Sequence, residues 1–249
     1  MRNDQIALQL YTVRRLLAED LPGTLEAVAR AGYRSVELAG LPPTDTATLA
    51  RALAGAGLRV VSAHESLESL RADELAVTQR LAELGCPRLV VPALPEADRA
   101  TPDRVRRAAA DLASIAERLA IAGIRLGYHN HAFEFQALED TTIWDVLLAA
   151  LPAAVDVELD VYWASVGGRD PVALIGSLAD RVRLLHMKDR AAGPQPRDAP
   201  PGAGILPWPQ IVAAARRAGV DWYIVEQDEP REPLVDIERG LRHLAGLAA

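Results

Sequence analysis

The stretch Ala122-Gly-Ile-Arg-Leu-Gly-Tyr-His129 closes an alanine-rich amphipathic segment, passes through a glycine and continues as a short apolar run ending in histidine. The same order recurs in Ala31-Gly-Tyr-Arg-Ser-Val-Glu-Leu38, Ala56-Gly-Leu-Arg-Val-Val-Ser-Ala-His64, Leu84-Gly-Cys-Pro-Arg-Leu-Val-Val91 and Ala218-Gly-Val-Asp-Trp-Tyr-Ile-Val-Glu226. Each glycine is expected just after a helix, where a left-handed backbone conformation is common. Helical segments that alternate with short apolar strands predict βα units and a parallel sheet.

Three further strands, at Ile6 to Leu10, Val155 to Asp160 and Val182 to His186, bring the number to eight. Helices are expected near 22–31, 44–55, 72–84, 102–121, 142–151, 170–179, 207–218 and 234–246. Eight βα units in 249 residues predict an α/β fold with one domain over residues 1–249, a single (β/α)8 TIM barrel. A doubly wound open sheet is the alternative, but no glycine-rich phosphate loop follows any strand.

The proline-rich stretch from Gly193 to Pro207 has neither a helical nor a strand period and is long for a connection. We expect it to be a βα loop or a lid near the site.

Composition narrows the class of partner. The net charge of −7 offers no basic field for nucleic acid, so small neutral or metal-chelated substrates fit better. The single cysteine, Cys86, excludes an internal disulfide framework and indicates a reducing compartment. The first apolar run is too short for a signal sequence or a membrane span, so we expect a cytoplasmic enzyme with no membrane partner.

Chemistry in TIM barrels takes place at the carboxyl ends of the strands. Four of the five histidines fall at such ends, and only His243 lies on a predicted helix. The polar residues at the predicted strand ends are Gln9, Tyr11, Glu37, His64, Glu65, His129, Asn130, His131, Asp160, His186, Lys188, Glu226, Gln227 and Asp228.

The run Val155-Asp-Val-Glu-Leu-Asp160 alternates apolar and acidic residues. Because alternate residues of a barrel strand face inward, Asp156, Glu158 and Asp160 are expected to point to the axis. We interpret Glu158 as part of a buried polar layer below the site. Converging buried carboxylates and imidazoles need compensation, and one divalent cation is the simplest form of it. Mixed oxygen and nitrogen ligands suit Mn²⁺, Mg²⁺, Co²⁺ or Zn²⁺.

Lys188 is the single lysine of the chain. A lone lysine in an arginine-rich sequence indicates a confined site that needs a compact or titratable cation. A chance surface lysine is the alternative.

The sequence resembles the xylose isomerase-like TIM barrels, in particular the sugar phosphate isomerase/epimerase branch, over nearly its whole length. The segments that carry the resemblance are Leu8-Gln-Leu-Tyr-Thr-Val13, Gly127-Tyr-His-Asn-His-Ala-Phe-Glu-Phe135, Leu159-Asp-Val-Tyr-Trp163, His186-Met-Lys-Asp189, Gly202-Ala-Gly-Ile-Leu-Pro-Trp208 and Ile224-Val-Glu-Gln-Asp228. The resemblance implies a divalent metal, Mn²⁺ by preference, held by acids after strands five, six and eight and a histidine after strand seven. Three of these ligands correspond to Asp160, His186 and Glu226.

The fourth ligand departs from the family pattern. Ketose epimerases have a glutamate at the end of strand five, where this chain has His129. We expect Glu134 to be the ligand because carboxylates dominate hard-cation sites, which leaves His129 or His131 as a base. In the alternative, His129 binds the metal and Glu134 holds a substrate hydroxyl.

The resemblance implies a metal-dependent isomerase or epimerase that removes a proton beside a metal-bound carbonyl of a sugar or sugar phosphate. We expect the catalytic groups to be His129, His131, Glu226 and Lys188, and the substrate contacts to be Gln9, Glu37, His64, Trp163 and Lys188. Trp163 and Trp208 either stack on the sugar or serve only in packing. The runner-up function is a metal-dependent lyase or dehydratase that performs β-elimination on a keto sugar or 3-keto-glycoside.

Two other classes remain open. An abasic-site endonuclease of the same superfamily would need more metal ligands and a basic surface, which the acidic composition disfavours. A non-catalytic sugar-binding barrel would have a pocket without metal. The sequence also leaves a homo-oligomer possible.

Overall fold

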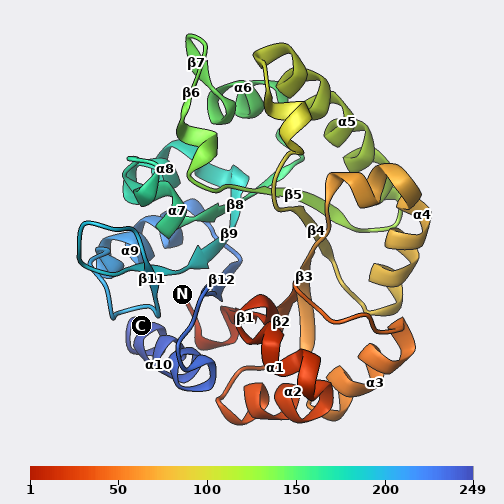
Figure 1. Ribbon diagram of the computed structural model, residues 1–249, viewed down its shortest axis with the longest axis vertical. Coiled ribbons are helices and arrows are strands. Elements are labelled where there is room, and N and C mark those ends of the chain that lie inside the picture. Colours follow the sequence, from red (N-terminus) through yellow and green to blue (C-terminus); the bar gives the residue numbers. More distant parts are fainter. Residues whose placement is uncertain (249) are drawn as a thin grey trace.

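The computed structural model describes residues 1–248. Eight parallel strands form a closed barrel in the order β1-β12-β9-β8-β5-β4-β3-β2, and helices surround it (Figure 1). The barrel strands are β1 (Ile6–Gln9), β2 (Ser35–Leu38), β3 (Arg59–His64), β4 (Arg88–Val91), β5 (Arg125–His129), β8 (Asp156–Asp160), β9 (Val182–Met187) and β12 (Trp222–Val225). The prediction of a (β/α)8 barrel is confirmed.

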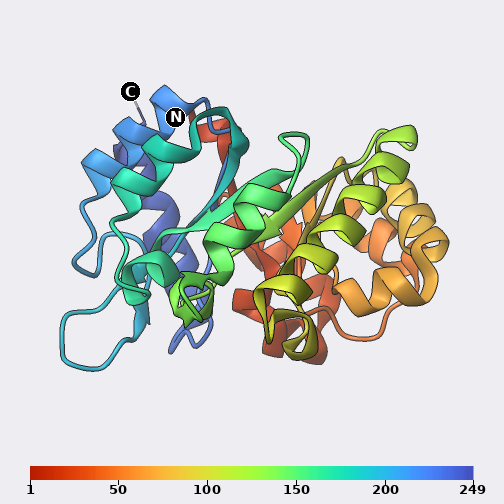
Figure 2. The same cartoon turned by 90° about the horizontal axis from the view of Figure 1, so that it is seen from above.

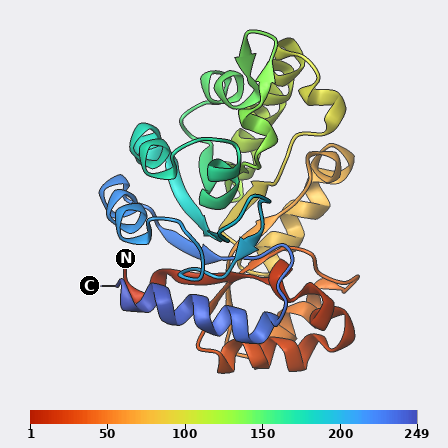
Figure 3. The same ribbon diagram turned by 60° about the vertical axis from the view of Figure 1, so that its left-hand side comes forward.

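The helices of the outer ring follow the predicted ranges closely. They are α2 (Leu21–Arg30), α3 (Thr46–Gly55), α4 (Leu67–Glu83), α5 (Pro102–Ile121), α6 (Ile143–Ala150), α8 (Pro171–Leu178), α9 (Trp208–Ala218) and α10 (Pro233–Gly246). The five glycines expected after helices have φ between 63° and 111°, as the left-handed ending requires. The last helix, α10, returns alongside β1, so the ends of the chain lie near each other (Figure 3).

Several short elements were not predicted. Two six-residue helices are α7 (Val161–Val166), which directly follows β8, and α1 (Arg14–Glu19), which follows β1 after a 3₁₀ helix at Leu10–Val13. Two small hairpins are built from β6 (Ala137–Leu138) with β7 (Thr141–Thr142), and from β10 (Asp189–Arg190) with β11 (Asp198–Ala199). Such elements are too short for a periodic pattern to reveal them.

The stretch 193–207 is a βα loop, as expected, and connects β9 to α9. It contains β11, which the sequence pattern did not indicate, and it projects from the barrel (Figure 2).

The inside of the barrel is layered. Asp156, at the amino end of β8, pairs with Arg125 and lies 3.7 Å from Arg88. A small apolar cluster of Ala7, Val61, Leu184 and Ile224 is separate from the main core between strands and helices. Ala7, Leu184 and Ile224 lie two residues before Gln9, His186 and Glu226, so they share the same inward side. The polar layer of the site therefore rests on an apolar floor.

Within residues 1–248, no helix has the length and apolarity needed to cross a membrane.

Candidate active site

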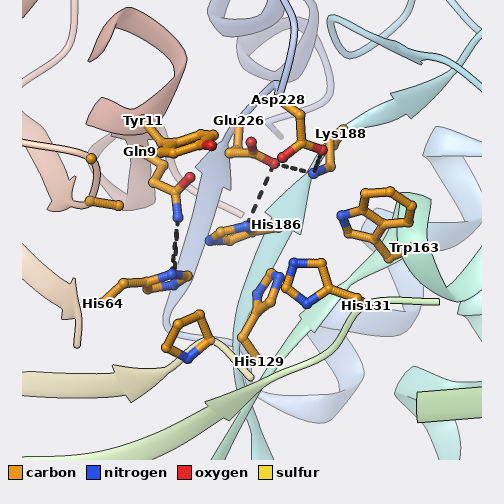
Figure 4. Close-up of a pocket in the computed structure, with 13 residues that line it drawn as sticks. Gln9, Tyr11, His64, His129, His131, Trp163, His186, Lys188, Glu226 and Asp228 are labelled. Carbon is orange, nitrogen blue, oxygen red and sulfur yellow. Dashed lines mark hydrogen bonds and ion pairs between the residues drawn. The ribbon is translucent and has the colours of Figure 1, made fainter. Parts of the chain in front are cut away.

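A pocket of about 260 Å³ opens at the carboxyl ends of the strands (Figure 4). Each barrel strand except β8 contributes a lining residue from its end or from the following loop, and α7 contributes Trp163. The lining residues are Gln9, Tyr11, Ala39, Gly40, His64, Pro92, His129, His131, Trp163, His186, Lys188, Glu226 and Asp228. Most of the predicted site residues therefore meet in one place.

Asp160, His186 and Glu226 form a group that could hold a metal ion, since one ligand atom from each lies within 4.8 Å of the others. His186 Nδ1 is 3.9 Å from both Asp160 Oδ2 and Glu226 Oε2. All three atoms are buried, and His186 Nδ1 has no hydrogen-bond partner among the described residues, whereas the two carboxylate oxygens face the ammonium of Lys188. A buried imidazole nitrogen without a partner is rare and calls for one, and with two carboxylate oxygens beside it the group fits a divalent cation.

Lys188 stands beside this group and is almost fully buried. Its Nζ lies 3.1 Å from Asp160 Oδ2 and 2.7 Å from Asp228 Oδ2, and it also contacts Glu226 Oε2. Burial alone would lower the pKa of Lys188, but the three carboxylates raise it well above its usual value. The lone lysine is thus a charged member of the site, and the alternative of a surface lysine is wrong.

A second group joins His64, His129, Glu158 and His186. Glu158 Oε2 lies 2.7 Å from His64 Nε2, 3.0 Å from His129 Nδ1 and 3.2 Å from His186 Nε2. Glu158 faces the axis as its alternation predicted, and it forms part of the network directly beneath the pocket. The alternation in the sequence predicted that Glu158 faces inward. It could not predict the three imidazole partners of Glu158, because they come from three other strands, β3, β5 and β9.

Glu37 orients His186 from the other side of the barrel. Its Oε1 lies 2.8 Å from His186 Nε2 and accepts a hydrogen bond of 3.0 Å from Gln9 Nε2, while Ser62 donates to Oε2. Burial opposes a charge on His186, yet Glu158 and Glu37 raise its pKa well above the usual value. A carboxylate that holds the outer nitrogen of a histidine fixes which nitrogen faces a metal, here Nδ1.

Glu134 lies apart from both groups of potential ligands. Its carboxylate accepts hydrogen bonds of 2.9 Å from the Tyr128 hydroxyl and 2.8 Å from the His131 backbone N–H. Burial raises the pKa of Glu134 to about 7. In the described structure Glu134 therefore holds the loop that carries His131.

The two strand-five histidines differ in their surroundings. His129 is engaged with Glu158, whereas His131 Nδ1 is buried without a hydrogen-bond partner among the described residues. Burial, helped by the charge of Lys188, lowers the pKa of His131 to about 4. His131 is consequently a neutral imidazole at neutral pH.

The two tryptophans have separate positions. Trp163 lines the pocket, with its ring centroid 5.6 Å from that of His131 and 5.2 Å from Lys188 Nζ. Trp208 is buried outside the pocket lining and donates its indole N–H to Asp189 at 2.7 Å. Of the two, Trp163 is the one positioned to meet a ligand.

Comparison with known proteins agrees with the barrel fold. Residues 25–247 match the family model described as xylose isomerase-like TIM barrel. The chain therefore belongs to the xylose isomerase-like TIM barrel family. Among curated proteins, none matches the chain.

Two solved structures from Parabacteroides distasonis, both described as sugar phosphate isomerase/epimerase, are similar to the whole chain. One is 26% identical with a TM-score of 0.85, covering 100% of this chain and 96% of that one. The other is 25% identical with a TM-score of 0.83, covering 98% and 99%. A structure of IolI protein with a bound zinc atom shares the fold at 14% identity and a TM-score of 0.76, covering 98% of both chains.

Proposed function

We propose that the protein is a divalent-metal-dependent sugar isomerase or epimerase. One observation carries the proposal: Asp160, His186 and Glu226 bring three buried ligand atoms together at the pocket, and the imidazole nitrogen among them has no hydrogen-bond partner in the described structure. A divalent cation held there would act as a Lewis acid on a sugar carbonyl and its neighbouring hydroxyl. The two similar proteins from Parabacteroides distasonis support the sugar as the class of substrate.

The proposed ligands are these three residues, and Mn²⁺ is the proposed metal because two of the three donors are carboxylates, which suit it. Three protein ligands leave coordination positions for a substrate. The fourth ligand expected after strand five is left out, because neither Glu134 nor His129 belongs to this group of ligand atoms.

His131 is the proposed general base. Its side chain lines the pocket, its buried Nδ1 has no hydrogen-bond partner among the described residues, and its low pKa keeps it unprotonated at neutral pH. Glu226 is the proposed partner on the other side, since burial raises its pKa to about 7, where a carboxyl can both give and accept a proton. Trp163 and the ammonium of Lys188 would position the sugar ring and its oxygens.

A lyase is the second candidate. The favouring observation is that the unpartnered imidazole of His131 and the ammonium of Lys188 line the same pocket. An imidazole can remove the proton while an ammonium protonates a departing oxygen, which would eliminate water or an aglycone from a keto sugar.

Proton NMR in D₂O tests both candidates. The enzyme, loaded with Mg²⁺ or Mn²⁺, is incubated with ketoses and 3-keto-glycosides, and the reaction is quenched before the spectra are recorded. Deuterium in an isomeric product supports the isomerase, and release of water or an aglycone supports the lyase. Glu226→Gln is expected to abolish either reaction, whereas Glu238→Gln, on the exposed surface of α10, is the matched control. Absence of exchange and elimination with every sugar would contradict both candidates.

A further inference from the structure

The loops after strands seven and eight are where TIM barrels frequently bind the phosphate of a substrate, through backbone amides. Here five amides of these loops already donate to carboxylates of the chain itself. We propose that the substrate is an uncharged sugar, carrying neither a phosphate nor a carboxylate. The inference rests on the proposed function and names the substrate class of the same site.

The first cluster of amides lies in the loop after β9, and its hydrogen bonds are accepted by the carboxylate of Asp189. Its Oδ2 accepts hydrogen bonds of 2.9 Å from the backbone N–H groups of Gly202 and Gly204, and its Oδ1 accepts one of 3.1 Å from Leu206. The Asp189 side chain is fully buried, and the indole of Trp208 completes its donors. These three backbone amides therefore donate to a carboxylate of the chain itself and are not available to bind a phosphate.

The second cluster of amides lies in the loop after β12, and its hydrogen bonds are accepted by the carboxylate of Asp198. Its Oδ2 accepts hydrogen bonds of 2.5 Å from the Asp228 N–H and 3.2 Å from the Glu229 N–H. The preceding amide, that of Gln227, donates to the hydroxyl of Thr12 at 3.0 Å. Because Asp198 lies on β11, the projecting loop after strand seven supplies the anion for the amides after strand eight.

The charges around the pocket also disfavour a substrate that carries a phosphate. Five carboxylates lie in the pocket wall or directly behind it, from Glu37, Glu158, Asp160, Glu226 and Asp228. Among the described residues that line the pocket, Lys188 is the one basic side chain apart from the histidines, and three of those carboxylates already surround it. These five carboxylates would offset the charge of Lys188 and the two charges of the proposed metal, so a phosphate dianion would find no uncommitted cation, and its contacts with carboxylates would suppress binding.

Paired ligands test the substrate class. Isothermal titration of the Mg²⁺-loaded protein would compare D-fructose with D-fructose 6-phosphate and D-xylulose with D-xylulose 5-phosphate. We expect each phosphate ester to bind roughly tenfold or more weakly than its parent sugar. An ester that binds as tightly as its parent would overturn the inference. If the parent sugar binds more tightly than its phosphate ester but exchanges no deuterium, the inferred substrate class is supported and only the proposed catalytic function is contradicted.

Phosphate binding by a variant tests, in the absence of any sugar, whether the carboxylate of Asp198 keeps these amides from binding an anion. In metal-free protein, Asp198→Ala frees the N–H groups of Asp228 and Glu229, while the buried Asp189 still anchors the loop. Phosphorus NMR with inorganic phosphate is expected to show binding to this variant at least about tenfold tighter than to wild type. Asp180→Ala, which removes the same charge from an exposed turn before β9, should behave as wild type. Equal phosphate binding by all three proteins, or none by Asp198→Ala, would overturn the inference.

Discussion

His186 Nε2 lies 2.8 Å from Glu37 Oε1, so the outer nitrogen of this imidazole is committed to a carboxylate while Nδ1 faces Asp160 and Glu226. The contact joins β2 to β9 across the barrel. It prepares the histidine for a cation on its Nδ1 side.

Glu37→Gln should therefore weaken metal binding without touching a proposed ligand. We expect Mn²⁺ affinity to fall by about 10–100-fold, since partners that orient a ligating histidine have effects of this size. Isothermal titration measures it. Glu65→Gln, whose carboxylate pairs with Arg80 at 3.1 Å, is the control and should keep wild-type affinity. Unchanged affinity in Glu37→Gln would remove Glu37 from this positioning role.

Lys188→Met leaves three carboxylates without their ammonium. We expect the metal-free variant to lose about 3–5 kcal/mol of unfolding free energy, the usual cost of breaking a buried ion pair by removing one partner. Because the carboxylates then lack any competing cation from this side chain, added Mn²⁺ should raise the thermal midpoint of the variant more than that of wild type. Thermal denaturation with and without Mn²⁺ checks both effects. Equal metal-induced shifts would show that ammonium and metal do not share these oxygens.

His131→Gln should separate catalysis from metal binding. Loss of a general base lowers rates by about 10²–10⁴-fold, and we expect this reduction in deuterium exchange. Mn²⁺ affinity should stay as in wild type, because His131 is outside both groups of potential ligands. A base with a pKa of about 4 is unprotonated above that pH, so His131 should cause no loss of rate between pH 5 and pH 8. His243→Gln on α10 is the control.

Glu134 should make the folded state depend on pH. Burial raises its pKa from 4.5, the value of an exposed glutamate, to about 7, so the folded protein holds a proton that the unfolded chain releases between these values. The stability it contributes is fully present below pH 4.5 and is lost as pH rises through 7.

Chemical denaturation across this window should show wild type losing up to roughly 3 kcal/mol more than Glu134→Gln. Parallel pH profiles for the two proteins would contradict the raised pKa. The variant should also keep its Mn²⁺ affinity, and a loss of metal binding would restore Glu134 as the strand-five ligand.

Much of the barrel and part of the site could be predicted from the sequence. Helix-ending glycines, such as Gly123 and Gly219, and the alternation in Val155 to Asp160 are local properties, because turn conformation and strand parity depend on neighbours in the chain. The gathering of His64, His186 and Glu226 followed from the same logic, since the ends of parallel barrel strands share one face.

Other features depended on contacts between distant segments. The joining of Glu158 to imidazoles from three strands, the commitment of Glu134 to Tyr128 and the covering of the Asp228 amide by Asp198 involve side-chain directions, strand stagger and loop paths that no local pattern encodes. The sequence by itself determined which chemical groups stand at the mouth of the barrel. Only the tertiary structure decided which of them are already partnered, because hydrogen bonding and burial depend on the surroundings that folding creates.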